Sequence, residues 1–138
     1  MKVHTTNYKN AFIEVAEDCP ATSGEVPPAK SSEKSVATMQ YELIGENPYK
    51  YTSDEVLFHC YATKNQLKKE ELETARKAFF SKGQPCLRCS PLTKRYGYGV
   101  HSDEEGRVAI YGRDTKEYKK YAADKKLLIV KAMRSKKG

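Results

Sequence analysis

Two cysteines three residues apart are the first candidates for chemistry in this chain. Cys86 and Cys89 form a CxxC motif, which occurs in zinc sites and in disulfide oxidoreductases. A zinc site needs two further ligands, yet no second cysteine pair follows and His101 lies well downstream. A thioredoxin-like pair belongs at the start of a helix, but Ser90 and Pro91 follow at once. We therefore interpret the pair as two small buried residues of an extended segment, and we predict four free thiols, no metal and no cofactor.

His101 and Asp103 have the residue types of a general acid–base pair. No activated nucleophile can be placed beside them from the sequence, so the alternative is an exposed turn rich in hydrogen-bonding groups. His59 stands in an apolar segment, which favours a core or half-buried histidine over a catalytic base.

The most informative stretch carries two cations followed by tyrosines interleaved with glycines. Lys94 and Arg95 can pair with phosphate or carboxylate, and the tyrosines offer stacking faces and hydroxyls. The glycines let a ligand or another backbone approach closely, or they face a packed helix in a Tyr-rich core hairpin. Their spacing fits neither a Walker loop nor a dinucleotide fingerprint. The candidate ligand-binding residues are Lys94, Arg95, Tyr96, Tyr98, His101 and Arg113.

A β-hairpin is needed to position these side chains. Apolar and polar residues alternate in 96–101 and in 107–111, and the loop between them ends in Gly106 at the expected left-handed position. We therefore place a hairpin at about 93–112.

The rest of the chain predicts a small α+β domain around this hairpin. The segment 56–62 is apolar on both periodicities and fits either a helix or a buried strand. Strands are expected at 11–16 and at a buried segment, 127–130, and helices at 36–44, at 68–82, from 53 onward and from 114 to about 124. Because helices and strands do not alternate regularly, we expect one domain, 1–138, with the hairpin and one or two further strands packed on three to four helices.

Two segments differ in composition from the remainder. Residues 18–35 are rich in proline, serine and lysine, which predicts a flexible loop, and residues 131–138 form a basic C-terminal tail. Residues 70–138 hold 17 basic and 9 acidic side chains, whereas residues 1–69 hold 8 and 9. This asymmetry indicates an anionic partner, either a small molecule or nucleic acid bound weakly and without sequence preference.

The sequence also limits where the protein acts. No apolar run approaches the roughly 18 residues of a membrane span, and the first residues lack the apolar core of a signal peptide. We therefore expect a cytoplasmic protein without a membrane partner.

Several segments together resemble one family of small bacterial proteins, catalogued as a domain of unknown function. They are 5–8, 12–20, 24–28, 47–54, 79–84, 90–97 and 131–136, and they span nearly the whole chain. The resemblance implies one intact domain and a bacterial cytoplasmic protein, without a known reaction or ligand. This chain has Tyr98 where family members often have Trp. It has Cys89 where they have other small residues, which argues against an essential CxxC pair.

Three functions fit these observations, and the sequence leaves open whether the protein is an enzyme. The first is a binding protein for an anionic ligand or partner, acting through its basic, Tyr-rich second half. The second is a small enzyme with a pocket beside the hairpin, using His101 with Asp103 or a cysteine. The third is an interaction module that self-associates as a homodimer.

Overall fold

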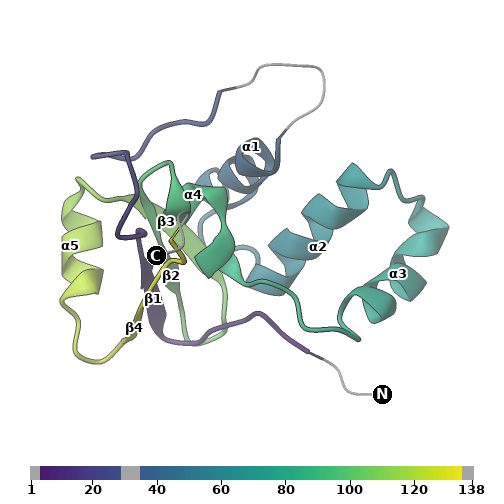
Figure 1. Cartoon of the computed structure of the whole chain (residues 1–138). Coiled ribbons are helices and arrows are strands. Elements are labelled where there is room, and N and C mark those ends of the chain that lie inside the picture. Colours follow the sequence, from purple (N-terminus) through teal and green to yellow (C-terminus); the bar gives the residue numbers. More distant parts are fainter. Residues whose placement is uncertain (1–3, 29–34, 135–138) are drawn as a thin grey trace.

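A mixed β-sheet lies at the centre of the computed structural model, which describes residues 4–28 and 35–134 (Figure 1). β1 is antiparallel to β2 and parallel to β4, and β3 is antiparallel to β2. Across the described residues, the order β3-β2-β1-β4 is formed by Val108–Gly112, Tyr98–Ser102, Ala11–Glu14 and Leu128–Lys131. The chain is therefore a small α+β domain, which confirms the predicted fold class.

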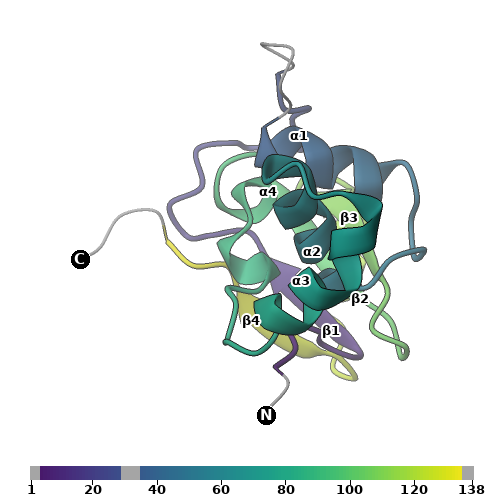
Figure 2. The same ribbon diagram turned by 90° about the vertical axis from the view of Figure 1, so that its right-hand side faces the viewer.

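The two faces of the sheet carry separate apolar clusters. Ile13, Val100 and Val108 point to one face, where they pack with residues of the helical layer. Phe12 points to the other face and packs against Tyr118. Figure 1 shows helix α5 alone on this second side, while Figure 2 shows α1, α2 and α3 in front of the opposite side. One layer of helices is thus larger than the other.

Helix α1, Val36–Gln40, begins where the sequence predicted. The Ser35 side chain accepts a hydrogen bond from the backbone N–H of Thr38, which caps the first turn. After Gln40 the chain continues as a wider π-helical segment, Tyr41–Gly45. The predicted helix at 36–44 is confirmed, with a change of winding inside it.

Helix α2, Ser53–Lys64, decides the ambiguous segment 56–62 in favour of a helix. The cap is Thr52, whose side chain and that of Glu55 form a reciprocal capping box. Apolar residues lie on more than one side of α2 because Val56 belongs to the core on the sheet and another side packs against α3, Leu72–Phe79. The α3 helix is shorter than the predicted 68–82, since Lys69–Glu71 form a separate 3-10 turn before it.

A short helix, α4, stands where the sequence predicted the start of the hairpin. Ser90 accepts a hydrogen bond from the Leu92 N–H, and Pro91 occupies the first helical position, so a turn of helix forms over Pro91–Lys94. The first hairpin strand therefore begins only at Tyr98. Before α4 the chain forms a 3-10 turn, Leu87–Cys89, and Cys89 is exposed, so the interpretation of the CxxC pair as two buried residues of an extended segment was wrong.

The C-terminal elements follow the prediction in kind but not in burial. Thr115 caps helix α5, Lys116–Ala122, which lies within the predicted range of 114 to about 124. The expected last strand is present as β4, but it is an outer strand of the sheet, and Leu128 is 55% exposed. The prediction of a buried segment was therefore wrong.

The loop predicted at 18–35 is held to the hairpin at its beginning. The Arg113 side chain donates to the Ala21 carbonyl, and the Glu25 N–H donates to the Tyr96 carbonyl. Residues 29–34 of that loop and residues 135–138 of the basic tail lie outside the described residues. Within the described ranges, no helix has both the length and the apolar character needed to cross a membrane.

Candidate functional site

The glycines of the Tyr-Gly-Tyr-Gly stretch make room for other segments of the same chain. Gly97 has a φ of +80°, and a Cβ there would lie 2.3 Å from the Ser23 carbonyl oxygen. A Cβ on Gly99 would lie 2.4 Å from the Phe12 ring and 2.6 Å from the Tyr118 ring. The stretch therefore packs against its own loop and helix α5, as the second of the two interpretations expected.

The candidate residues of this stretch do not assemble into one site. Tyr98 is buried beside Tyr41, with ring centroids 5.8 Å apart, and burial raises its pKa to about 12. Strand alternation turns His101 to the opposite face of the sheet. Lys94 ends α4 and Arg95 is exposed beyond it.

Two of the remaining candidates hold the loop before them. The Tyr96 backbone carbonyl accepts from Glu25, and the Arg113 guanidinium donates to Ala21 at 2.8 Å. The binding role proposed for these residues stays a prediction. In the structure, their hydrogen bonds hold the loop against the hairpin.

Three tyrosine side chains meet around His101. The Tyr49 hydroxyl lies 2.8 Å from His101 Nδ1 and 2.9 Å from the Tyr111 hydroxyl, and the Tyr121 ring stacks on the imidazole with centroids 4.1 Å apart. Tyr49 holds a left-handed φ of 60°, an uncommon conformation for tyrosine. Burial lowers the pKa of His101, against the opposing influence of Asp103 and Asp124.

Asp103 has a different partner from the one that an acid–base pair requires. Its carboxylate accepts the backbone N–H groups of Glu105 and Arg107, each at 2.9 Å, and so shapes the hairpin loop. In the described chain no hydrogen bond joins it to His101, whose Nδ1 is taken by Tyr49. Sequence reasoning missed Tyr49 because it is far from His101 along the chain.

The cysteines are free thiols in distinct surroundings. Burial raises the pKa of Cys60 to about 11, which disfavours its thiolate, while Cys89 is exposed. The Tyr8 hydroxyl lies 3.7 Å from Cys86 Sγ. Among residues 4–28 and 35–134, no three His, Cys, Asp or Glu side chains are grouped so that they could hold a metal ion.

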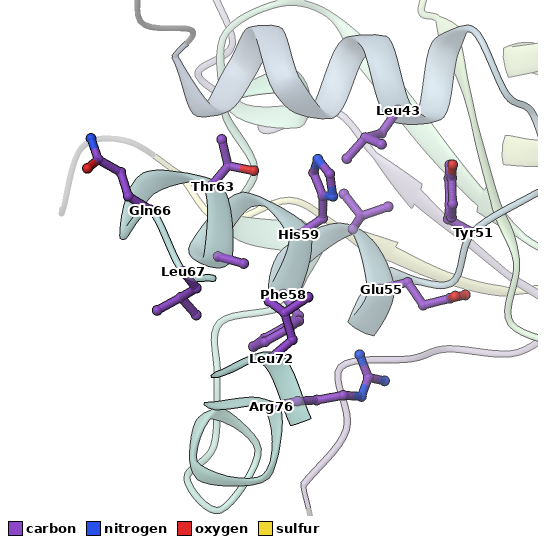
Figure 3. Close-up of a pocket in the computed structure, with 12 residues that line it drawn as sticks. Leu43, Tyr51, Glu55, Phe58, His59, Thr63, Gln66, Leu67, Leu72 and Arg76 are labelled. Carbon is purple, nitrogen blue, oxygen red and sulfur yellow. The ribbon is translucent and has the colours of Figure 1, made fainter. Parts of the chain in front are cut away.

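The helical layer contains a cavity of about 470 Å³ between α2, α3 and the π-helical segment. This volume lies within the range of small-molecule sites, which are mostly apolar with a few polar groups. The apolar part of its wall comes from Leu43, Tyr51, Val56, Phe58, Ala62, Leu67 and Leu72. The polar part comes from Glu55, His59, Thr63, Gln66 and Arg76, and Figure 3 shows Glu55 and Arg76 toward one end and Gln66 toward the other.

Arg76 is the cation of this cavity. Its guanidinium lies 5.7 Å from the Phe58 ring centroid and 5.1 Å from that of Phe80, so two aromatic faces hold it in place. Within the described chain it has no carboxylate partner, whereas the neighbouring Lys77 pairs with Glu73 at 3.6 Å. The arrangement presents a fixed guanidinium beside an apolar wall.

The one carboxylate that lines the cavity is already engaged. Glu55 Oε1 accepts the Thr52 N–H at 3.0 Å in the capping box of α2. His59 is exposed at the cavity rather than half-buried, so the expectation for it was wrong. The sequence signal for this site was the apolar character of 56–62 on both periodicities, which reflects a helix with a core on one side and a cavity on another.

The fold and the cavity define a small α+β protein with an apolar, cation-bearing pocket in its helical layer. The chain belongs to a family of unknown function, DUF6157, whose model matches residues 3–138. This confirms the resemblance found in the sequence. No curated protein and no solved structure matches the chain.

Proposed function

We propose that the protein binds a small amphipathic organic anion in the α2–α3 cavity, with the apolar part of the ligand inside and its acid group on Arg76. The observation that supports this most directly is a guanidinium that no carboxylate of residues 4–28 and 35–134 pairs with, at an apolar cavity of about 470 Å³. The proposal keeps the anionic ligand expected from the sequence and moves its site from the hairpin to the helical layer.

The chemistry of the wall sets the ligand class. A carboxylate or sulfonate can accept two parallel hydrogen bonds from a guanidinium, which a neutral alcohol cannot do. Phe58, Leu72 and their apolar neighbours favour a hydrocarbon or aromatic body, because each square ångström of apolar surface removed from water contributes about 25 cal/mol.

Fluorescence titration with anilinonaphthalene sulfonate tests the proposal, because this dye combines an aromatic body with a fixed anion. We expect the wild-type protein to bind the dye, and decanoate to displace it better than decanol. Arg76→Gln should weaken dye binding about tenfold or more, since hydrogen bonds to charged groups contribute about 1.5–3 kcal/mol.

Lys77→Gln is the matched control, because Lys77 is the next residue of α3 and already pairs with Glu73. Circular dichroism checks that both variants keep the fold, since partly unfolded chains also bind this dye. Equal affinities of the Arg76 and Lys77 variants, or equal displacement by decanol and decanoate, would contradict the proposal.

A further inference from the structure

Within the part of the chain that the structure describes, strand β4 leaves one edge of the sheet open. Its Leu128 N–H donates to the Asn10 carbonyl and its Ala132 N–H to the Glu14 carbonyl, so these residues face β1. Strand alternation then turns the N–H groups of Ile129 and Lys131 outward. In the described chain no further strand lies beside them.

The opposite edge of the same sheet is covered. The Tyr49 N–H donates to the Val108 carbonyl and the Val108 N–H donates to the Tyr51 carbonyl, both at 2.9 Å. The segment before α2 therefore occupies the outer side of β3. The difference between the two edges matters because an uncovered edge strand is a template for pairing with another chain.

One contact already uses the end of the open edge. The Arg88 Nε donates to the Lys131 carbonyl at 2.6 Å, and the Met133 N–H donates to the Arg88 carbonyl at 2.8 Å. These bonds fix the strand at its C-terminal end, so the outward groups before it are held in an extended, pre-organised line.

Apolar side chains stand exposed at both ends of this line. Leu128 is 55% exposed and Met133 is 47% exposed, and both are among the large apolar residues that the described chain leaves in water. β4 has four residues and carries Lys131, and short strands and lysines do protect an edge, but neither accounts for exposed apolar side chains at its ends. This pattern favours a partner that covers them.

Cations surround the same strand. Lys125 and Lys126 precede β4, and a hollow of about 470 Å³ at its other end is lined by Glu17, Arg88, Lys131, Ala132, Met133 and Arg134. Three of those six side chains are basic and one is acidic. The charge therefore selects an acidic partner.

We propose that an extended, acidic segment of a partner protein adds to the sheet as a new strand beside β4. Its backbone pairs with the outward N–H and carbonyl of Ile129 and with the N–H of Lys131, since the Lys131 carbonyl is bonded to Arg88. Its apolar side chains cover Leu128 and Met133, and its carboxylates face the surrounding cations. A second copy of this chain is a poorer occupant. In the antiparallel pairing centred on Leu128, Lys125 of each copy would lie opposite Lys131 of the other, and like charges so placed are destabilising.

A labelled synthetic peptide of alternating glutamate and valine serves as the probe in a fluorescence anisotropy titration. Its control has the same sequence with every backbone nitrogen methylated, which removes the pairing N–H groups on both sides and keeps charge and apolar content. We expect the unmodified peptide to bind at about 0.1 M salt and the methylated peptide to bind at least tenfold more weakly.

Two substitutions at one position test the same backbone contact from the protein side. Lys131→Gln and Lys131→Pro both remove the cation, but only proline also removes the outward N–H, and an edge strand tolerates proline there. We expect the proline variant to bind the unmodified peptide at least tenfold more weakly than the glutamine variant. If the proline variant fails to fold, the two peptides still give the comparison with the wild-type protein.

Three results would overturn the proposal. Equal binding of the two peptides would mean general charge attraction instead of strand addition, and no binding of either would mean that the edge is not a docking surface. Sedimentation that shows a dimer disrupted by Lys131→Pro would assign the edge to a second copy. The cavity of α2 and α3 has no part in this test, so either proposal can fail without the other.

Discussion

His101 is held on two sides, by the Tyr49 hydroxyl at Nδ1 and by the Tyr121 ring stacked on the imidazole. Burial lowers its pKa from the ordinary value of 6.5. The unfolded chain therefore takes up a proton at His101 before the folded protein does as the pH falls. The contribution of this residue to stability is present above pH 6.5 and is lost as the pH falls toward the lower folded pKa.

The first prediction at this scale is a pH-dependent loss of stability that His101→Gln reduces. Urea unfolding at several pH values from 7.5 down to about 5.5 should show a smaller decrease in the free energy of unfolding for the variant than for the wild type. His4 and His59 are unchanged in both proteins, so they cancel in the comparison. Parallel pH profiles of the two proteins would contradict the assignment.

Single residues show what the sequence could and could not predict about the site. His101 and Asp103 stand out by type, but their true partners are Tyr49 and backbone amides, which depend on tertiary contacts. Arg76 looks like any exposed cation of a helix until the cavity beside it is known.

At the scale of elements, β2 and α5 pack together through a glycine. Gly99 faces Phe12 and Tyr118, and a Cβ there would come within 2.6 Å of both rings. We predict that Gly99→Ala destabilises the protein by about 1–3 kcal/mol, the usual cost of overpacking a core. Chemical unfolding measures this loss.

Gly45→Ala is the matched control for that prediction. A Cβ on Gly45 would first meet the Ile110 side chain at 3.5 Å, which is an ordinary contact. The control should therefore change the free energy of unfolding much less than Gly99→Ala. Similar effects of the two substitutions would show that the close approach at Gly99 is easily relieved.

Elements with local signals were the ones the sequence predicted well. Ser35 and Thr52 each cap backbone N–H groups only three residues away. Gly106, with its φ of +82°, likewise shapes only the loop in which it lies. The α4 helix was missed because a glycine-rich β pattern follows it at once. The exposure of β4 was missed because an apolar run does not tell an inner strand from an outer one.

At the scale of the whole molecule, the surplus of basic side chains is spread over several helices and is not gathered on one face. Basic residues lie on α3, at the end of α4 and on α5, and Figure 1 shows α3 and α5 on opposite sides of the molecule. A straight DNA duplex can contact only part of these cations at once.

We therefore predict weak binding to duplex DNA that is independent of sequence. With about four to six phosphates contacted, the slope of log affinity against log salt should be roughly −4 to −5. Replacing both Lys94 and Arg95 with alanine should lower the affinity for unrelated duplexes alike, because phosphate contacts carry no sequence information. A salt titration by fluorescence anisotropy measures both quantities, and tight binding to one sequence at high salt would contradict the prediction.

The central position of β1 bears on how the protein folds. Its two neighbours in the sheet are formed by residues 98–102 and 128–131. Both edges of β1 therefore pair only with segments that are distant in the sequence. Such non-local pairing requires large loops to close before it contributes stability, which slows folding. During synthesis β1 leaves the ribosome early and unpaired, and the nascent chain must keep this apolar strand from aggregating until its flanking strands emerge.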